Sequence, residues 1–238
     1  MTTTDSIKRQ TDAPTATPPE VVLFDMDGVI LEGRGTDAVV HSRALDDVLE
    51  HRGLTVDDGL RARLDTYEYT DTFIAACEEL GIDPSRLYTE REERSAKRSI
   101  ERLAAGTRSL YPDAGSINRL AEHVPVGLGS NNYDPTVSFV VDHFRLDQFS
   151  HVRGRELGPE GFLRRKPDPH YLDEALDAIG ARSGYYIGDR ETDVLAAERA
   201  GLDGVFIRRD HNAELDLTVD PTVEIESLEE LLPLVSAP

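Results

Sequence analysis

Residues 21–28 read VVLFDMDG, and the fold prediction starts from them. Its first four residues form a short apolar run with β-branched side chains, which predicts a strand buried in a parallel sheet. The run stops at Asp25-Met26-Asp27-Gly28. Ligands of open α/β sheets bind beyond the carboxyl ends of the strands. The two aspartates are therefore the first candidate functional residues.

Strands and helices alternate along the second half of the chain. Apolar runs predict strands at residues 124–129, 149–152, 185–187 and 204–207. Helices are expected at residues 114–123, 134–144, 168–179, 191–200 and 228–235. Asp134 is expected to cap its helix, with Pro135 at the first helical position. The alternation predicts an α/β fold, with a doubly wound, mainly parallel sheet covered by helices on both faces.

Residues 36–105 show a different pattern. Apolar residues recur there at helical spacing and no strand signal interrupts them, so this segment reads as a helical domain inserted after the first strand. We expect the sheet domain at 19–32 and 109–238 and the insert at 33–108. Residues 1–18 are polar and rich in Thr and Pro, which predicts a disordered tail rather than a secretory signal.

Composition excludes several classes of function. The 238 residues carry a formal net charge of −20, which argues against nucleic-acid binding and against attraction to anionic lipids. The sequence contains no run of about 18 apolar residues, so no membrane span is predicted. Cys77 is the single cysteine, so no intrachain disulfide can form. These features suit a cytoplasmic protein.

The basic residues are unevenly divided. Only three of the 26 are lysines, at positions 8, 97 and 166, and the others are arginines. Abundant acid with scarce lysine predicts a halophilic protein, because a high net charge keeps a chain soluble at high ionic strength. The alternative is an ordinary acidic protein from a GC-rich genome.

Polar residues gather at the predicted carboxyl ends of the strands. They comprise four carboxylates, a hydroxyl and an ammonium, from Asp25, Asp27, Asp189, Asp193, Ser130 and Lys166. Four carboxylates in one cleft repel one another unless a cation lies among them, and an all-oxygen set suits Mg²⁺. The lysine, the hydroxyl and backbone N–H groups would hold a dianion. The constellation suits phosphoryl transfer.

Four short motifs in this order resemble the signature of the haloacid dehalogenase-like (HAD) hydrolases. They are Asp25-Met26-Asp27-Gly28, Ser130-Asn131, Lys166-Pro167-Asp168-Pro169 and Gly188-Asp189-Arg190-Glu191-Thr192-Asp193. The spacing and the insert after the first motif are similar to the phosphoglycolate phosphatase-like branch. The resemblance implies a Rossmann-like catalytic core with a helical cap, here the insert at 33–108.

The same resemblance implies a role for each motif residue. Asp25 would be the nucleophile that forms an aspartyl-phosphate, and Asp27 the general acid and base. Mg²⁺ would be bound by the Asp25 carboxylate, the Asp27 carbonyl and Asp189, with Asp193 as a ligand or behind one. The phosphate would be held by Ser130, Asn131 and Lys166. The expected partner is a small phosphorylated metabolite, and the chain is expected to be a monomer or a homodimer.

Several alternatives remain open at this stage. A phosphosugar mutase would keep the same motifs, and a non-catalytic binding protein could keep the fold. Dehalogenase chemistry is disfavoured, because Asp27 supplies a proton that such a leaving group does not need. Asp168 is interpreted as a helix cap, and the seven histidines, which lack ligand spacing, as structural or exposed.

The segment after the first motif departs from the family pattern. Residues 29–36 read VILEGRGT, where many relatives have a Thr-Leu pair followed by Asp-Ser. Two glycines flank Arg34, which predicts a flexible hinge that presents a cation near the cleft. One hypothesis is that Arg34 contacts an acidic substrate, and the other is that it is a simple hinge residue.

Overall fold

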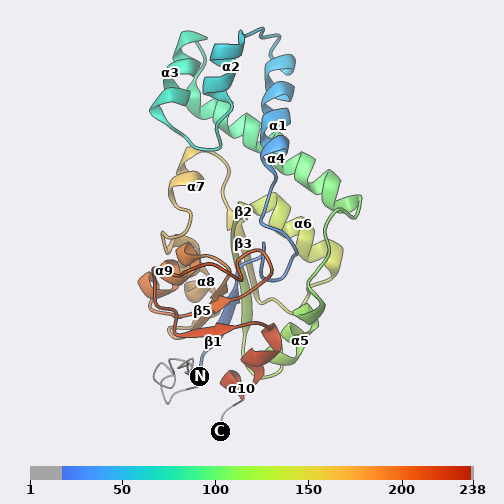
Figure 1. Cartoon of the computed structure of the whole chain (residues 1–238), viewed down its shortest axis with the longest axis vertical. Helices are drawn as coiled ribbons and strands as arrows, with labels where there is room; N and C mark the ends of the chain where they lie inside the picture. The colour runs from blue at the N-terminus through green and yellow to red at the C-terminus, as the bar shows by residue number, and fades with distance from the viewer. Residues whose placement is uncertain (1–17, 237–238) are drawn as a thin grey trace, which may run out of the picture.

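A six-stranded parallel sheet forms the centre of the computed structural model, which describes residues 18–236 (Figure 1). The predicted tail, at residues 1–18, lies outside this range except for its last residue. The strand order is β3-β2-β1-β4-β5-β6, and every neighbouring pair is parallel. The strands are β1 (Val21–Phe24), β2 (Val126–Tyr133), β3 (His151–Arg155), β4 (Gly184–Gly188), β5 (Asp203–Ile207) and β6 (Val223–Ile225). The predicted doubly wound α/β fold is confirmed.

Helices cover both faces of this sheet. Those of the sheet domain are η1 (Pro112–Gly115), α5 (Ser116–Ala121), α6 (Asp134–Phe144), α7 (Pro159–Leu163), α8 (His170–Ile179), α9 (Glu191–Arg199), η2 (Leu228–Leu231) and α10 (Leu232–Val235). Side chains alternate between the two faces along a strand. In β1, Val21 and Leu23 therefore join the core with α8 and α9, whereas Val22 and Phe24 join the core with α5 and α6.

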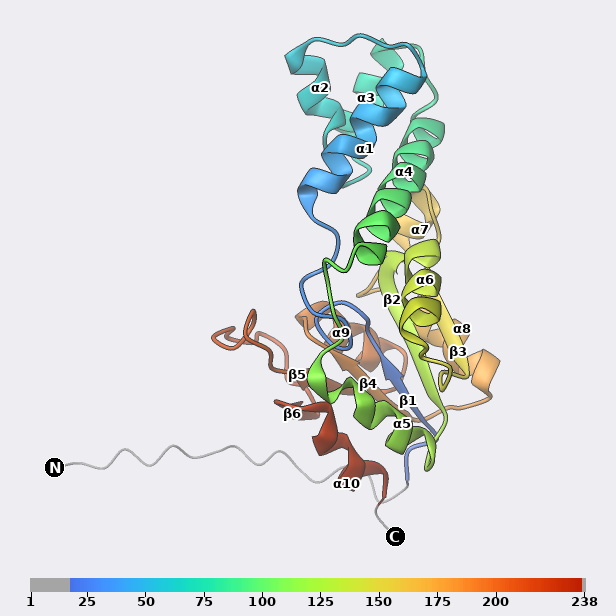
Figure 2. The ribbon, with the colours of Figure 1, turned by 90° about the vertical axis from the view of Figure 1, so that its right-hand side faces the viewer.

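Four helices separate β1 from β2 along the chain. They are α1 (Ala38–His51), α2 (Asp58–Leu64), α3 (Asp71–Glu79) and α4 (Pro84–Ala104), and they lie together at one end of the molecule (Figure 2). They enclose an apolar cluster of their own, which includes Leu45, Phe73 and Tyr88 and also receives Phe162 from α7. No helix within residues 18–236 is long and apolar enough to cross a membrane.

Two chain segments link these helices to the sheet and run beside each other. Leu31 forms an antiparallel bridge with Leu110, and the Glu32 N–H donates to the Ser109 carbonyl at 2.9 Å. Arg108 adds side-chain hydrogen bonds to the carbonyls of Glu32, at 2.5 Å, and Gly33, at 3.3 Å. The linkers therefore move as a pair if the helices shift relative to the sheet.

A buried ion pair joins α4 to the end of β3. The Arg155 guanidinium contacts both carboxylate oxygens of Glu92, at 2.5 and 3.2 Å, and the two side chains are 0% and 1% exposed. The Gly158 N–H also donates to Glu92, at 2.7 Å. A buried charge of this kind is tolerated inside a protein when an opposite charge and hydrogen bonds accompany it. The contact fixes one edge of the insert to the sheet.

Local differences from the sequence-based expectations have simple causes. Strand β6 and helix α7, with three and five residues, are too short to give a periodic signal. Asp134 does not cap its helix. Its carboxylate instead accepts a hydrogen bond from the Gly154 N–H of the neighbouring strand β3, at 2.9 Å. The helix expected to open at Asp168 begins at His170, whose N–H donates to the Asp168 carboxylate at 2.9 Å.

The buried pair predicts a large effect on stability. Glu92→Ala leaves the Arg155 charge buried without its partner, so we expect the free energy of unfolding to fall by about 3–5 kcal/mol. Denaturant unfolding would measure this change. The matched control is Glu101→Ala, which removes the partner of Lys97 in an exposed pair at 4.0 Å and should change stability by less than about 1 kcal/mol. Equal effects of the two variants would contradict the anchoring role.

Candidate active site

The carboxyl ends of three adjacent strands bring the predicted site residues together. Asp25 directly follows β1, Ser130 lies within β2 and Asp189 directly follows β4. Asp193 lies in the first turn of α9, and Lys166 comes from the loop between α7 and α8. All five are at most 5% exposed. Parallel strands place these separate motifs at one edge of the sheet.

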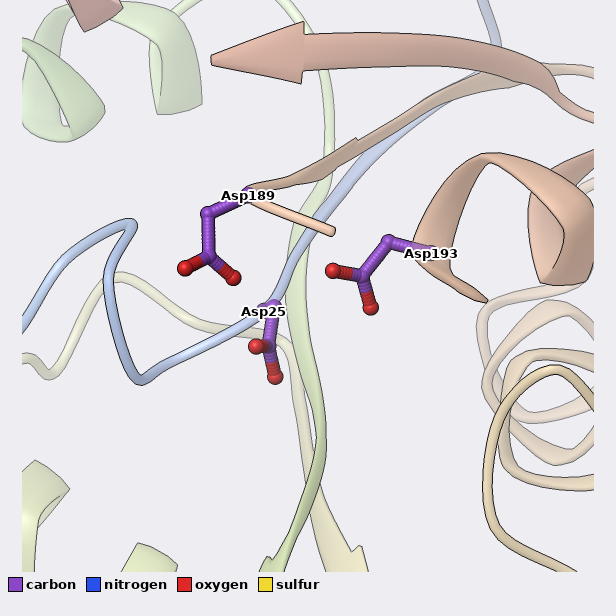
Figure 3. A group of neighbouring side chains, drawn as sticks. All are labelled: Asp25, Asp189 and Asp193. Atoms are coloured by element: carbon purple, nitrogen blue, oxygen red, sulfur yellow. The ribbon is translucent and has the colours of Figure 1, made fainter. Parts of the chain in front are cut away.

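Three carboxylates form the centre of the site. Asp25, Asp189 and Asp193 each offer an oxygen within 4.8 Å of the others, and their side chains point toward one another (Figure 3). Burial, with the nearby Asp25 charge, raises the pKa of Asp189 to about 7, and burial raises the pKa of Asp193 to about 6. Within the described residues, the buried Asp189 Oδ1 accepts no hydrogen bond. A buried, all-oxygen set with an unused acceptor atom fits a hard divalent cation.

Lys166 supplies the positive charge on the other side of the cluster. Its ammonium lies 2.9 Å from Asp25 Oδ1 and 2.7 Å from Asp193 Oδ1, and it contacts the Tyr186 hydroxyl at 2.5 Å. Burial disfavours the charged lysine, but the attraction of Asp193 and Asp25 is larger and holds its pKa well above the usual value. The Tyr186 hydroxyl donates to the Gly129 carbonyl at 2.8 Å, so Lys166 is fixed through β2.

Asp27 is held by two groups that the sequence analysis did not single out. Arg108 Nη2 lies 2.6 Å from Asp27 Oδ1, and the Asn132 amide donates to Oδ2 at 2.7 Å. Arg108 belongs to the second linker and also contacts the first. The orientation of the Asp27 carboxylate is therefore tied to both connections between the insert and the sheet.

The two residues of the second motif, Ser130 and Asn131, make different contacts. Ser130 is 2% exposed, and its hydroxyl accepts the Asn132 N–H at 3.3 Å. The Asn131 side chain is committed to the backbone of Lys166, accepting its N–H at 2.8 Å and donating to its carbonyl at 3.3 Å. Asn131 therefore positions Lys166 through its side chain.

The cluster opens into a cavity of about 310 Å³ between the sheet and the insert. Its cationic lining residues are Arg34 and Arg190, and Arg190 donates to the Arg34 carbonyl at 2.6 Å. The remaining walls come from Asp25, Asp27, Gly35, Thr36, Ala38, His41, Tyr67, Ser130, Asn131, Asn132 and Tyr133. A space of this size accommodates a small ligand.

His41 contributes an uncharged wall to this cavity. Burial, aided by Arg91 and Arg155, lowers the pKa of His41 to about 4, so the imidazole is neutral at physiological pH. Its Nδ1 lies 2.8 Å from the Ser95 hydroxyl. The interpretation of all histidines as merely structural or exposed therefore misses a cavity residue.

His211 is the second histidine that the sequence analysis missed. Its Nε2 lies 2.6 Å from Asp189 Oδ2, although residue 211 follows β5 and carries no motif. Burial and nearby arginines lower its pKa. Neither His211 nor Arg108 could be found from sequence spacing, because both reach the site from loops distant in the chain. Asn132, in contrast, directly follows the second motif.

The chain is similar to known proteins over most of its length. Residues 19–201 match the family model of haloacid dehalogenase-like hydrolases. A phosphoglycolate phosphatase of Yersinia pseudotuberculosis is 25% identical over 239 residues, which covers 91% of this chain and 93% of that relative.

Solved structures with low identity support the fold. CbbY from Rhodobacter sphaeroides, solved in complex with phosphate, aligns with a TM-score of 0.62 at 18% identity and covers 92% of this chain and all of that one. A Thermotoga maritima protein described as a candidate beta-phosphoglucomutase aligns with a TM-score of 0.52 at 17% identity, covering 91% and 98% of the two chains.

The family match covers strands β1 to β4, the insert and all four motifs. The resemblance noted in the sequence is confirmed: the chain belongs to the haloacid dehalogenase-like hydrolases, and its phosphatase-named relatives support a phosphatase.

Proposed function

We propose that this protein is a Mg²⁺-dependent phosphomonoester hydrolase that acts on a small phosphorylated metabolite. The observation that carries the proposal is the buried Asp25 carboxylate, which lies between Lys166 and the carboxylates of Asp189 and Asp193 and lines the cavity. A buried carboxylate surrounded in this way can attack phosphorus without a competing proton if cationic charge balances the cluster.

The proposed reaction uses the residues of this chain in two steps. An oxygen of Asp25 attacks phosphorus, the bond from phosphorus to the ester oxygen breaks, and protonated Asp27 gives its proton to that leaving oxygen. Water then attacks the aspartyl-phosphate, Asp27 takes the proton of that water, and inorganic phosphate leaves with Asp25 restored. Asn132 and Arg108 hold Asp27 at the mouth of the site.

The phosphate and metal would be held by different groups. Ser130, the backbone N–H of Asn131 and Lys166 would bind the phosphate oxygens. The carboxylates of Asp25 and Asp189 and the Asp27 carbonyl would hold Mg²⁺, while both Asp193 oxygens already have partners in Lys166 and the Arg190 N–H. When bound, Mg²⁺ would neutralise charge on the phosphoryl group and on the carboxylates.

The finer expectations from the sequence belong to the same proposal. The guanidinium of Arg34 lines the cavity and has no ion-pair partner among residues 18–236, which favours a substrate with an additional acidic group. We further propose a cytoplasmic, halophilic monomer or homodimer without nucleic-acid or membrane partners, consistent with the net charge of −20.

A phosphosugar mutase is the second candidate, because it needs the same motifs and a mutase-described protein shares the fold. A phosphatase releases inorganic phosphate, whereas a mutase forms an isomer of its substrate. Assaying both products over a panel of sugar phosphates separates the two. A protein that binds Mg²⁺ but turns over nothing would be the non-catalytic alternative.

The first prediction tests the reaction itself. Purified protein should release phosphate from p-nitrophenyl phosphate and from members of a metabolite-phosphate panel with Mg²⁺, and EDTA should abolish the release. Asp25→Asn removes the nucleophile and should lower turnover by at least about 1,000-fold while the protein stays folded. A variant that keeps a tenth of the activity would rule out the covalent mechanism.

The raised pKa of Asp189 gives Mg²⁺ binding a pH dependence. In the metal-free protein this carboxyl has a pKa of about 7, against 3.8 for an ordinary aspartate, so it keeps its proton up to about pH 7. Because the folded chain binds this proton more tightly than the unfolded chain, protonated Asp189 stabilises the fold at low pH, and this contribution to the free energy of unfolding is lost as the pH rises through about 7. Because the cation needs the ionised form, the Mg²⁺-induced rise in melting temperature should grow from about pH 5.5 to about pH 8.

The matched control for this pH dependence is Asp189→Asn. This variant cannot ionise at position 189, so Mg²⁺ should raise its melting temperature little at any pH. A Mg²⁺ effect in the natural chain that is the same at both pH values would contradict the assignment of Asp189 to the metal.

The acidic surface predicts a salt dependence. At a net charge of −20, added KCl screens self-repulsion, so melting temperature and phosphatase activity should both rise from low to molar salt. Comparing KCl with sucrose at equal osmolarity separates screening from general exclusion of solute. Greatest stability at low salt would refute the halophilic interpretation.

A further inference from the structure

The loop after β5 forms hydrogen bonds to two parts of Asp189, the candidate metal ligand. His211 Nε2 lies 2.6 Å from Asp189 Oδ2, and when Asp189 is ionised, as a metal ligand must be, its carboxylate can only accept, so the imidazole donates. The next residue, Asn212, donates its amide to the Asp189 carbonyl at 2.9 Å and to the Ile207 carbonyl at 3.0 Å. Side chain and backbone of Asp189 are thus held by two consecutive residues.

Because of these hydrogen bonds, the two carboxylate oxygens of Asp189 differ in their partners. Oδ2 is occupied by His211, whereas Oδ1 is buried and accepts no hydrogen bond. The nearest cationic nitrogen to Oδ1 is Arg190 Nε at 3.7 Å, beyond hydrogen-bond distance. Asp189 therefore presents one free oxygen to the cluster with Asp25 and Asp193.

The first motif prevents the pair from rearranging. Gly28 has a φ of +79°, and a Cβ atom at this position would lie 2.2 Å from Asp189 Oδ2 and 3.1 Å from His211 Cε1. The backbone of the loop after β1 therefore packs directly against the hydrogen-bonded pair. With Asp189 1% and His211 17% exposed, the carboxylate has little room to rotate.

We propose that His211 is a positioning residue that makes Asp189 a one-oxygen ligand and thereby favours Mg²⁺ over Ca²⁺. The inference rests on the proposed metal site and extends it to a residue outside the four motifs. Mg²⁺ requires a strict octahedron with few carboxylate oxygens, whereas Ca²⁺ takes six to eight oxygens and accepts two-oxygen carboxylates. Blocking Oδ2 withholds an oxygen that only Ca²⁺ would use.

The test measures ion binding rather than turnover. Isothermal titration calorimetry of the metal-free full chain with MgCl₂ and with CaCl₂ gives two dissociation constants for each variant. His211→Phe keeps a ring but removes the donor, and should weaken Mg²⁺ binding by about 10- to 100-fold while Ca²⁺ binding changes by less. The preference for Mg²⁺ should therefore fall by about tenfold or more.

Two further variants separate orientation from general damage. His211→Gln restores an N–H donor near the position of Nε2 and should recover the Mg²⁺ preference to within about threefold of the natural chain. His123→Gln, at an exposed histidine just before the amino end of β2 and therefore away from the carboxyl edge that carries the site, should change neither constant. If His211→Phe fails to fold by circular dichroism, His211→Ala takes its place with the same expectation.

The outcomes distinguish this inference from the proposed function. An unchanged Mg²⁺ preference in His211→Phe, or an equal loss for both ions that His211→Gln does not restore, overturns the role of His211 and leaves the metal site standing. Failure of the natural chain to bind Mg²⁺ overturns the metal site and this inference together. A lowered preference that His211→Gln restores supports the inference.

Discussion

The repulsion between carboxylates buried at one edge of the sheet is the constraint on which the rest of the structure depends. Asp25, Asp189 and Asp193 lie within 4.8 Å of one another and are nearly inaccessible to water. Unbalanced buried charge is expensive, and here it shows as raised pKa values for two of the three. The buried ammonium of Lys166 offsets part of this charge, and Asp189 Oδ1, which accepts no hydrogen bond from the described residues, fits a cation.

The helical insert completes this site without contributing to the cluster. It is fixed to β3 through the pair of Glu92 and Arg155, and its linkers are joined by Arg108. The same Arg108 contacts Asp27, so the residue proposed to move protons is attached to the connection that any motion of the insert must use. The cavity and the orientation of Asp27 thus both depend on the contact between the two parts of the chain.

Much of this was predictable from sequence because the signals are local. Apolar runs predicted five of the six strands, and the three that lead into Asp25, Ser130 and Asp189 predicted the site edge. The longest gap without strands predicted the insert. The short edge strand β6 and the helix α7 escaped because three to five residues carry no period. Asp134 and Asn131 were assigned to a helix cap and to phosphate, yet their side chains serve the backbone of neighbouring segments.

The sequence by itself determined the family, the parallel sheet and the motif residues that face its carboxyl edge, since each depends on residues within a few positions of one another. Only the tertiary structure decided which side chains hold those residues in place. Arg108 and His211 reach Asp27 and Asp189 across 81 and 22 positions of chain. Such contacts depend on how loops pack in space, and the spacing of residues along the sequence does not predict that packing.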